Sequence, residues 1–258
     1  MSGFQNVHDS VDVDPAHKMR FAILSDIHAN LEALEATIAD AKENECTHFV
    51  CLGDIVGYNA NPHECVERVR GLECPVVRGN HDEHASLDSS NRDFNELAER
   101  AINWTRENLT KADQAWLLGL RLTRQVREFT IVHATLDTPS QWGYVLNNLD
   151  AVASFTYQHT TLCFFGHTHV PIAFVRADGV NRVKMDRITI EDGKKYFINA
   201  GSVGQPRDGD WRAAYCIYHC EKNLVELRRV KYDVATAQRK VRQAGLPERL
   251  ADRLTYGR

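Results

Sequence analysis

Histidine, aspartate and asparagine recur along this chain in short clusters, and most of the clusters directly follow an apolar run. The clusters are Asp26-Ile27-His28, Gly53-Asp54, Gly79-Asn80-His81-Asp82, His133 and Gly166-His167-Thr168-His169. In an α/β protein such apolar runs predict buried strands, and ligand sites gather beyond the carboxyl ends of strands. We therefore expect the clusters to lie close together in the folded chain.

The side chains in these clusters are suited to metal ions. Carboxylate, amide and imidazole donors without a thiolate suit divalent Mn, Fe, Zn, Ni or Co and disfavour a structural zinc site, but they do not choose among these ions. We take Mn as the favoured ion. The candidate ligands are too many for one open catalytic ion, and they fit two ions that share a carboxylate at a separation of roughly 3.5–4 Å. These candidates are Asp26, His28, Asp54, Asn80, His133, His167 and His169.

The elements that must position these residues alternate between strands and helices as far as Pro171. Apolar runs predict strands over 21–24, 49–52, 75–77, 121–126, 128–132 and 162–165. Apolar residues at helical spacing predict helices over 30–44, 61–70, 93–118 and 147–157, with a break near Thr110. After Pro171, alternating runs at 171–176, 183–190, 195–199, 213–219 and 224–231 predict a second, mostly antiparallel sheet, followed by helices over 234–244 and 247–256. The expected fold class is α/β, a two-sheet β-sandwich with helices on both outer faces.

Length and composition are those of a globular domain. The chain has 258 residues, of which 43% are hydrophobic and 26% are charged, and it contains no repeat or Pro/Ser-rich linker. We expect one domain over 19–258. Residues 1–18 are polar and lack periodicity, so we expect a flexible leader, with either Met1 or Met19 as the true start.

Charge and cysteine content narrow the possible partners. The formal net charge is −4, which argues against stable, sequence-independent binding to nucleic acid. The 7 cysteines form no CxxC pair, which indicates reduced thiols. No apolar run has the length of a membrane span, and the N-terminus lacks the apolar segment of a signal peptide. We therefore expect a cytoplasmic protein without a membrane partner, whereas the sequence does not indicate its oligomeric state.

The ordered set D-x-H, G-D, G-N-H-D, H and G-H-T-H resembles the signature of the calcineurin-like metallophosphoesterase superfamily. The stretch from Asn199 to Arg207, NAGSVGQPR, resembles the N-P-G-S-V-x-x-P-R segment of its small bacterial and archaeal phosphodiesterase branch. The resemblance extends from Arg20 to about Lys231. It implies the calcineurin-like metallophosphoesterase fold and a hydrolase that uses two metal ions.

The resemblance also implies a role for each candidate. One ion would be held by Asp26, His28 and His169, the other by Asn80, His133 and His167, and Asp54 would bridge them. His81 would be catalytic, facing the phosphate to stabilise or protonate the leaving oxygen. The implied reaction is in-line attack on phosphorus by a metal-bridging hydroxide.

Other residues near the clusters have less certain roles. Arg207 either binds the substrate phosphate or closes a turn after Pro206, and we take it as a substrate-binding candidate. Asp82 either orients His81 or is a turn residue. Trp142 is either a packing anchor or a residue that lines the cleft, whereas Tyr58 is expected in a solvated loop.

The leading hypothesis is a metal-dependent phosphoesterase that hydrolyses phosphodiesters or phosphomonoesters of a small substrate, with nucleotides among the candidates. One alternative is a phosphoprotein phosphatase or a dinucleoside-polyphosphate hydrolase. Such relatives usually carry G-D-x-V-D-R-G, whereas this chain has Gly57-Tyr58 in place of the Asp-Arg pair. Another alternative is a catalytically silent scaffold, as in the retromer subunit of the superfamily, although this chain retains all the signature residues.

Overall fold

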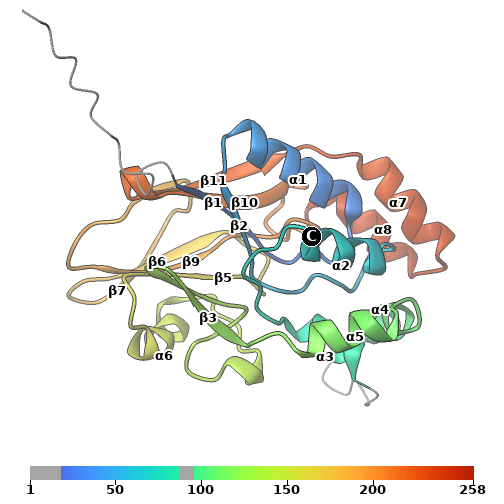
Figure 1. Cartoon of the computed structure of the whole chain (residues 1–258), viewed down its shortest axis with the longest axis horizontal. Helices are drawn as coiled ribbons and strands as arrows, with labels where there is room; N and C mark the ends of the chain where they lie inside the picture. The colour runs from blue at the N-terminus through green and yellow to red at the C-terminus, as the bar shows by residue number, and fades with distance from the viewer. Residues whose placement is uncertain (1–18, 88–95) are drawn as a thin grey trace, which may run out of the picture.

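Two β-sheets pack face to face in the computed structural model, and helices cover both outer faces (Figure 1). The structure describes residues 19–87 and 96–258, so the predicted leader over 1–18 and the start of the helix predicted from residue 93 lie outside the described residues. The two-sheet α/β architecture expected from the sequence is confirmed. No helix in the described ranges is long and apolar enough to cross a membrane.

The first sheet has the strand order β2-β1-β10-β11-β8, and β1 and β2 are its parallel pair. Its strands are β1 (Arg20–Leu24), β2 (His48–Cys51), β8 (Arg187–Thr189), β10 (Ala213–His219) and β11 (Leu224–Val230). The second sheet has the order β3-β4-β5-β9-β6-β7, with β4, β5 and β9 parallel. Its strands are β3 (Thr123–Val126), β4 (Phe129–Val132), β5 (Leu162–Phe165), β6 (Ile172–Arg176), β7 (Val180–Val183) and β9 (Lys195–Asn199).

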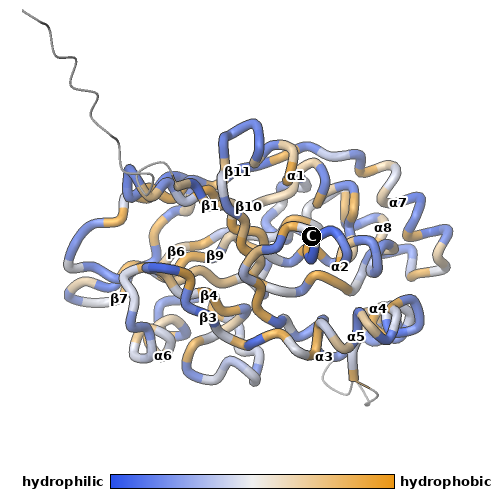
Figure 2. The backbone as a smooth tube through the Cα atoms, viewed as in Figure 1, coloured by the Kyte–Doolittle hydropathy of each residue, from blue (hydrophilic) through white to orange (hydrophobic). Residues whose placement is uncertain are grey.

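Alternate residues of the strands face different apolar layers, as the two-residue period of a strand requires. In β1, Phe21 and Ile23 belong to the core between the sheets, where Phe21 meets Phe129 of the other sheet at a ring distance of 5.2 Å. Ala22 and Leu24 face the opposite way and pack under helix α1 (Leu31–Glu43). Helix α6 (Asn148–Tyr157) covers the outer face of the second sheet. Figure 2 shows apolar strands inside and mixed helices such as α7 (Val234–Gln243) outside.

Two helices begin at the cap residues that the sequence predicts. The side chain of Asn30 accepts from Ala33 N and caps α1. The break expected near Thr110 separates α4 (Glu96–Glu107) from α5 (Lys111–Leu118), because Thr110 caps α5. The remaining helices are α2 (Pro62–Arg70), α3 (Asn80–Ser86) and α8 (Glu248–Tyr256), together with short 3-10 turns at Pro139–Gln141 and Cys220–Lys222.

The prediction of a separate second sheet built from the strands after Pro171 is wrong. β9 lies parallel to β5 within the second sheet, whereas β10 lies antiparallel to β1 in the centre of the first. The run predicted over 183–190 is divided between β7 and β8, which belong to different sheets. Alternation shows which residues of a strand face a core, but it does not show which strand lies beside it, so the partners could not be inferred from this pattern.

Two further predictions of local structure need correction. The run predicted as a strand over 75–77 forms only isolated bridges, from Cys51 to Val76 and from Val77 to Arg121. The segment after Gly79 was not predicted to be helical, yet α3 begins at Asn80. Its first turn is held by Asp82, whose Oδ2 accepts from Gly79 N at 3.0 Å. An N-terminal turn of this kind fixes the direction of the Asn80 and His81 side chains.

Candidate metal centre

The strands bring all seven predicted ligands to one place. Asp26 and Asp54 follow the parallel strands β1 and β2, whereas His133 and His167 follow the parallel strands β4 and β5. Potential ligand atoms lie within 4.8 Å of one another in two groups, one of Asp26, His28, Asp54 and His169, the other of Asp54, His133 and His167. Asp54 therefore belongs to both groups.

Asn80 joins the second group from the first turn of α3. Its Oδ1 lies 3.2 Å from Nε2 of His133. All seven side chains are buried, with Asn80 the most exposed at 8%. Buried carboxylates and imidazoles at this density need a compensating charge, because an unpaired buried charge is costly.

Three of the histidines are oriented by backbone carbonyl groups. Nδ1 of His28, His133 and His169 donates to the carbonyl oxygens of Val56, Leu52 and Gln205 at 3.0, 2.8 and 2.6 Å. A carbonyl oxygen can only accept, so each Nδ1 carries the hydrogen. Each Nε2 therefore points its lone pair into the cluster when the ring is neutral, which is the arrangement of metal-binding histidines.

The contact between His28 and His169 tests whether a cation fits. Their two Nε2 atoms lie 3.1 Å apart. Burial lowers the pKa of both rings well below the usual histidine range, which keeps them neutral at pH 7. Two neutral Nε2 atoms at this distance would face each other as acceptors. A divalent cation between them relieves this repulsion, so the donor set fits a metal ion.

The two carboxylates differ in their electrostatic environments. Burial raises the pKa of Asp26, and the neighbouring Asp54 carboxylate raises it further. Burial also raises the pKa of Asp54, but its interactions with His133, His81 and His28 together lower the pKa overall. Oδ2 of Asp54 lies 3.3 Å from Nε2 of His133 and 3.6 Å from Nε2 of His28. This oxygen is thus placed between the two ligand groups.

Most of the predicted ligands lie in strained backbone. Five of them have positive φ angles between 49° and 65°, namely Asp26, His28, Asp54, His167 and His169. This left-handed conformation is uncommon for non-glycine residues and persists only where surrounding contacts hold it. The loops hold one another: His28 N donates to Asp54 O at 2.9 Å, and His167 N donates to Asp26 Oδ1 at 3.1 Å.

A glycine precedes several of the ligands because the neighbouring loops approach very closely. A Cβ at Gly79 would overlap Oδ1 of Asp54, and a Cβ at Gly166 would overlap Oγ of Ser25 and lie 2.5 Å from Oδ2 of Asp26. Only glycine leaves room for these carboxylates at that spacing. These glycines therefore allow the loops to pack closely enough to bring the candidate ligands together.

His81 lies beside the metal ligands. Its backbone N donates to Asp54 Oδ1 at 2.8 Å, and its ring contacts those of His28 and Tyr58 at 4.7 and 4.5 Å. Burial lowers its pKa to about 4. A Cβ on Gly57 would collide with Nδ1 of His81, and Gly57 has a φ of +96°. The His81 ring therefore packs directly on Gly57. In the protein-phosphatase motif G-D-x-V-D-R-G this position is an aspartate.

A cavity of about 730 Å³ opens onto this centre. Asp54, His81, Arg207 and Trp142 line it, so of the two roles considered for Trp142 the structure favours the cleft. The guanidinium group of Arg207 lies 5.6 Å from the ring centre of Tyr58, and its Nη2 donates to Gln205 Oε1 at 2.9 Å. Arg207 thus reaches the cavity.

Sequence reasoning missed several residues of this cavity. Tyr58, expected in a solvated loop, is buried at 7% exposure and lines the wall. Tyr144 stacks on His167 at 4.3 Å, and His84 and Arg253 also line the cavity. These residues carry no local signal, because their position depends on how distant elements pack.

Asp82 is a buried residue whose side chain joins two segments of the chain. Its Oδ1 accepts from Ile55 N at 2.8 Å and from Val56 N at 3.3 Å, while Oδ2 accepts from Gly79 N. The carboxylate is completely buried. It therefore ties the loop after Asp54 to the start of α3, which carries Asn80 and His81.

Comparison with known proteins identifies similar chains over nearly the whole sequence. Residues 19–223 match the model of the calcineurin-like phosphoesterase superfamily domain. An uncharacterized protein of Methanocaldococcus jannaschii is 40% identical over 248 residues, which cover 93% of this chain and 99% of that protein.

Two solved structures are similar in fold. The crystal structure of a metallophosphoesterase from Sphaerobacter thermophilus has a TM-score of 0.82 and 39% identity, covering 93% of this chain and all of that one (100%). A hypothetical protein from Pyrococcus horikoshii OT3 has a TM-score of 0.76 and 18% identity, covering 93% of this chain and 99% of that one. The second similarity concerns the fold alone.

Proposed function

Because this chain belongs to the calcineurin-like phosphoesterase superfamily, we propose that it is a dinuclear metal-dependent phosphoesterase that hydrolyses phosphodiesters or phosphomonoesters. The observation that carries the proposal is the pair of buried ligand groups that share Asp54. One shared carboxylate between two sets of imidazoles is the arrangement that two neighbouring divalent ions require.

We assign the ligands in the same two sets. Asp26, His28 and His169 would hold one ion, Asn80, His133 and His167 would hold the other, and Asp54 would bind both. Nitrogen and oxygen donors of this kind accept Mn, Fe, Zn, Ni or Co. We propose Mn as the favoured ion. Ions bound here supply Lewis-acid chemistry: they lower the pKa of water and neutralise negative charge on a phosphoryl group.

The chain's own residues would bind and orient the phosphate. His81 lies next to Asp54 and lines the cavity, so its ring can stabilise the leaving oxygen by donating a hydrogen bond. The guanidinium of Arg207 can bind two phosphoryl oxygens at once. Tyr58, Trp142 and Tyr144 form aromatic walls that exclude water and can stack on a flat group. A substrate with a flat ring, such as a nucleotide, would fit against these aromatic side chains.

The alternatives are less well supported. Gly57 and Tyr58 occupy the place of the Asp-Arg pair with which phosphoprotein phosphatases bind phosphate. A catalytically silent scaffold would not need five strained ligand residues around one carboxylate. A dinucleoside-polyphosphate hydrolase remains compatible with the cavity, since Arg207 and Arg253 both line it.

Hydrolysis of bis-p-nitrophenyl phosphate and of p-nitrophenyl phosphate tests the proposal. The purified protein is loaded with each of the five metals in turn, and the same measurement is made after chelation. We expect metal-dependent release of p-nitrophenol from at least one ester, greatest with Mn. Metal-loaded protein that hydrolyses neither ester above the rate of the free metal would contradict the proposal.

A further inference from the structure

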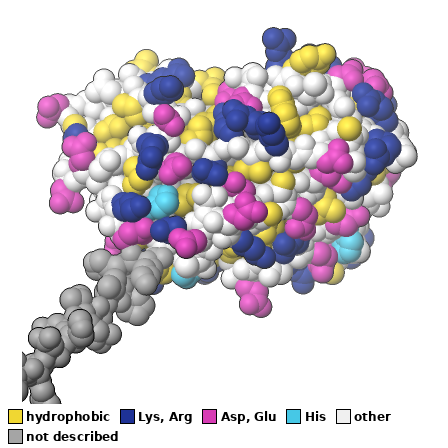
Figure 3. Space-filling model, turned by 90° about the horizontal axis from the view of Figure 1, so that it is seen from above, with side chains coloured by type: hydrophobic (Ala, Val, Ile, Leu, Met, Phe, Trp, Pro, Cys, Tyr) yellow, Lys and Arg dark blue, Asp and Glu magenta, His cyan; other side chains and the backbone are white. Residues whose placement is uncertain are grey.

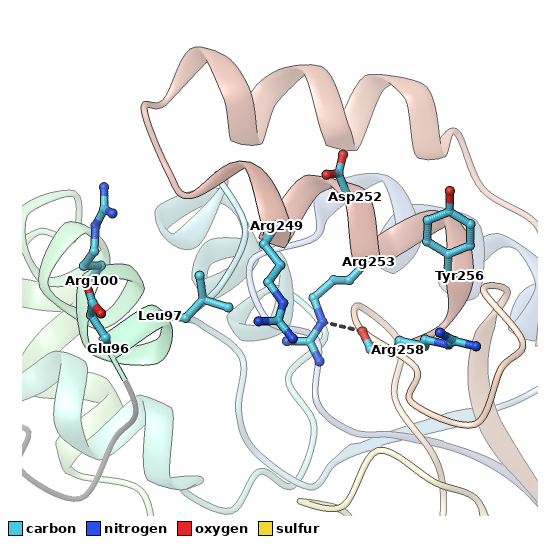
Figure 4. Close-up of a pocket in the computed structure, with 8 residues that line it drawn as sticks. All are labelled: Glu96, Leu97, Arg100, Arg249, Asp252, Arg253, Tyr256 and Arg258. Carbon is cyan, nitrogen blue, oxygen red and sulfur yellow. Dashed lines mark hydrogen bonds between the residues drawn. The ribbon is translucent and has the colours of Figure 1, made fainter.

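A second cavity adjoins the metal cavity, and arginine side chains dominate its lining. It has a volume of about 710 Å³ and lies between α4 and α8 (Figure 4). Leu97 and Arg253 line both cavities, so the two share a wall. Arg100, Arg249 and Arg258 also line this second cavity. We refer to it as the arginine cavity.

Helix α8 separates its charged side chains by sign. Glu248 and Asp252 bind Arg242 of α7, at 2.6 and 3.0 Å. Arg249 and Arg253 lie four residues apart and project together on the side away from Asp252 (Figure 4). Asp252 also lines the cavity, but its carboxylate is already paired with Arg242.

Three arginines that line the cavity form no ion pair with a carboxylate side chain in the part of the chain that the structure describes. Within residues 19–87 and 96–258, Arg100, Arg249 and Arg258 form no ion pair, although Glu96 also lines the cavity. Arg253 is half-buried, and its Nε donates to the main-chain carboxyl oxygen of Arg258, the last residue of the sequence. Like charges four residues apart on a helix destabilise it. An anion bound among these arginines would remove this repulsion.

A row of guanidinium groups connects this cavity with the metal centre. Arg207 and Arg253 lie over the ring of Tyr58, with distances of 5.6 and 5.9 Å to its centre. Burial and the charges of Arg207 and Arg249 lower the pKa of Arg253 to about 10. Arg253 is therefore close enough to interact both with Arg207 of the metal cavity and with Arg249 of the arginine cavity.

We propose that the arginine cavity binds a second phosphate group of the substrate, so that the preferred substrates are phosphoesters carrying at least one further phosphate. The inference rests on the proposed function, because the first phosphate would lie at the metal ions. Guanidinium groups bind phosphate through two parallel hydrogen bonds, and several unpaired ones around a cavity match its charge. A substrate with a single phosphate would leave them without a partner.

A matched pair of substrates tests this inference. Thymidine 5′-(p-nitrophenyl phosphate) and its 3′-phosphorylated form have the same scissile bond and differ by one phosphate. We expect kcat/KM of the wild type to be about tenfold higher for the phosphorylated form, mainly through KM. In Arg249→Gln and Arg100→Gln this ratio should fall toward one. Arg242→Gln is the control, since Arg242 is paired with Glu248 and Asp252, and it should keep the wild-type ratio.

A ratio near one in the wild type, or the same ratio in Arg249→Gln as in the wild type, would overturn the inference. If the wild type hydrolyses neither ester, the proposed function fails, and product binding decides the inference separately. Calorimetry should then show about tenfold tighter binding of thymidine 3′,5′-bisphosphate than of thymidine 5′-monophosphate, with the difference lost in Arg249→Gln. Equal affinities for the two nucleotides would overturn it.

Discussion

At the scale of single residues, Asp54 connects every part of the site. One oxygen accepts from His81 N, and the other lies within 3.6 Å of the Nε2 atoms of His28 and His133. Asp54→Asn keeps an oxygen for His81 N but removes the negative charge that both metal groups share. Removing a residue that only hydrogen-bonds to a metal ligand typically lowers metal affinity or activity about 10–100-fold. Asp54 is itself a proposed ligand, so we expect its substitution to lower kcat/KM by at least roughly 100-fold. Steady-state kinetics check this, with circular dichroism as the control for folding. Activity within threefold of the wild type would contradict the assignment.

Gly57 offers a second test at this scale. Gly57→Ala should lower kcat at least about tenfold, because a tenfold change needs only about 1.4 kcal/mol of lost transition-state stabilisation and the new Cβ displaces the His81 ring. Gly193→Ala is the control: Gly193 has a φ of +78° with nothing within 4 Å of the added Cβ. Both substitutions carry the left-handed penalty of roughly 1–2 kcal/mol, so similar losses of stability are expected. Equal activities would argue against a role for His81.

The candidate ligands could be predicted because aspartates and histidines stood at the ends of apolar runs. Tyr58 and Arg253 could not be predicted as cavity residues. A tyrosine in a loop and an arginine on a helix are both common, and only the packing of distant elements brings these two side chains to the cavity. The positive φ angles of Asp26 and His167 are equally invisible in the sequence. They arise from hydrogen bonds between loops that lie far apart in the chain.

At the scale of elements, the loop after β2 and the start of α3 act as one unit. The buried Asp82 carboxylate accepts from Ile55, Val56 and Gly79 N–H groups. Asp82→Ala would leave these donors without a partner, and each buried unsatisfied group costs about 1–3 kcal/mol. We expect the free energy of unfolding to fall by at least about 3 kcal/mol, and metal affinity to fall roughly 10–100-fold.

A matched control for Asp82→Ala is Asp150→Ala. Asp150 accepts from Leu146 and Asn147 N–H groups at the start of α6, where it is partly exposed. We expect a loss of about 1 kcal/mol in stability and unchanged metal affinity. Denaturant unfolding and metal titration measure both quantities. If Asp82→Ala binds metal as tightly as Asp150→Ala does, Asp82 does not position the ligands.

The helices were easier to predict than the order of the strands. Thr110 marked the break between α4 and α5 because its side chain competes for backbone N–H groups. Within the run predicted over 183–190, only Val183 belongs to β7, and Arg187–Thr189 form β8 of the other sheet. This division was not predictable, because an alternating pattern does not show which sheet a residue joins. The first turn of α3 was missed because Asn80 and His81 carry no helical periodicity.

At the scale of the whole molecule, charge is mixed outside and concentrated at two sites. On the face in Figure 3, Lys and Arg side chains alternate with Asp and Glu side chains. The carboxylates of the candidate metal centre are buried instead, and four arginines line the arginine cavity beside them, together with Glu96 and Asp252. An acidic chain with a net charge of −4 can thus present local positive charge to phosphates.

Metal binding should stabilise the whole fold, because the ligands come from both sheets and from α3. At a hundredfold excess over Kd, a bound ion contributes about 2.7 kcal/mol. For a chain of this size we expect chelation to lower Tm by roughly 5–10 °C. Differential scanning calorimetry should show one transition, as expected for a single domain over 19–258. An unchanged Tm on chelation would contradict metal binding in the core, and two separate transitions would contradict the single domain.

The most direct test of two ions held by one shared carboxylate is electron paramagnetic resonance of protein loaded with two equivalents of Mn²⁺. We predict the spectrum of an exchange-coupled manganese pair in the wild type, and loss of the coupling in Asp54→Asn. The spectrum of separate, uncoupled Mn²⁺ ions in the wild type would contradict the account.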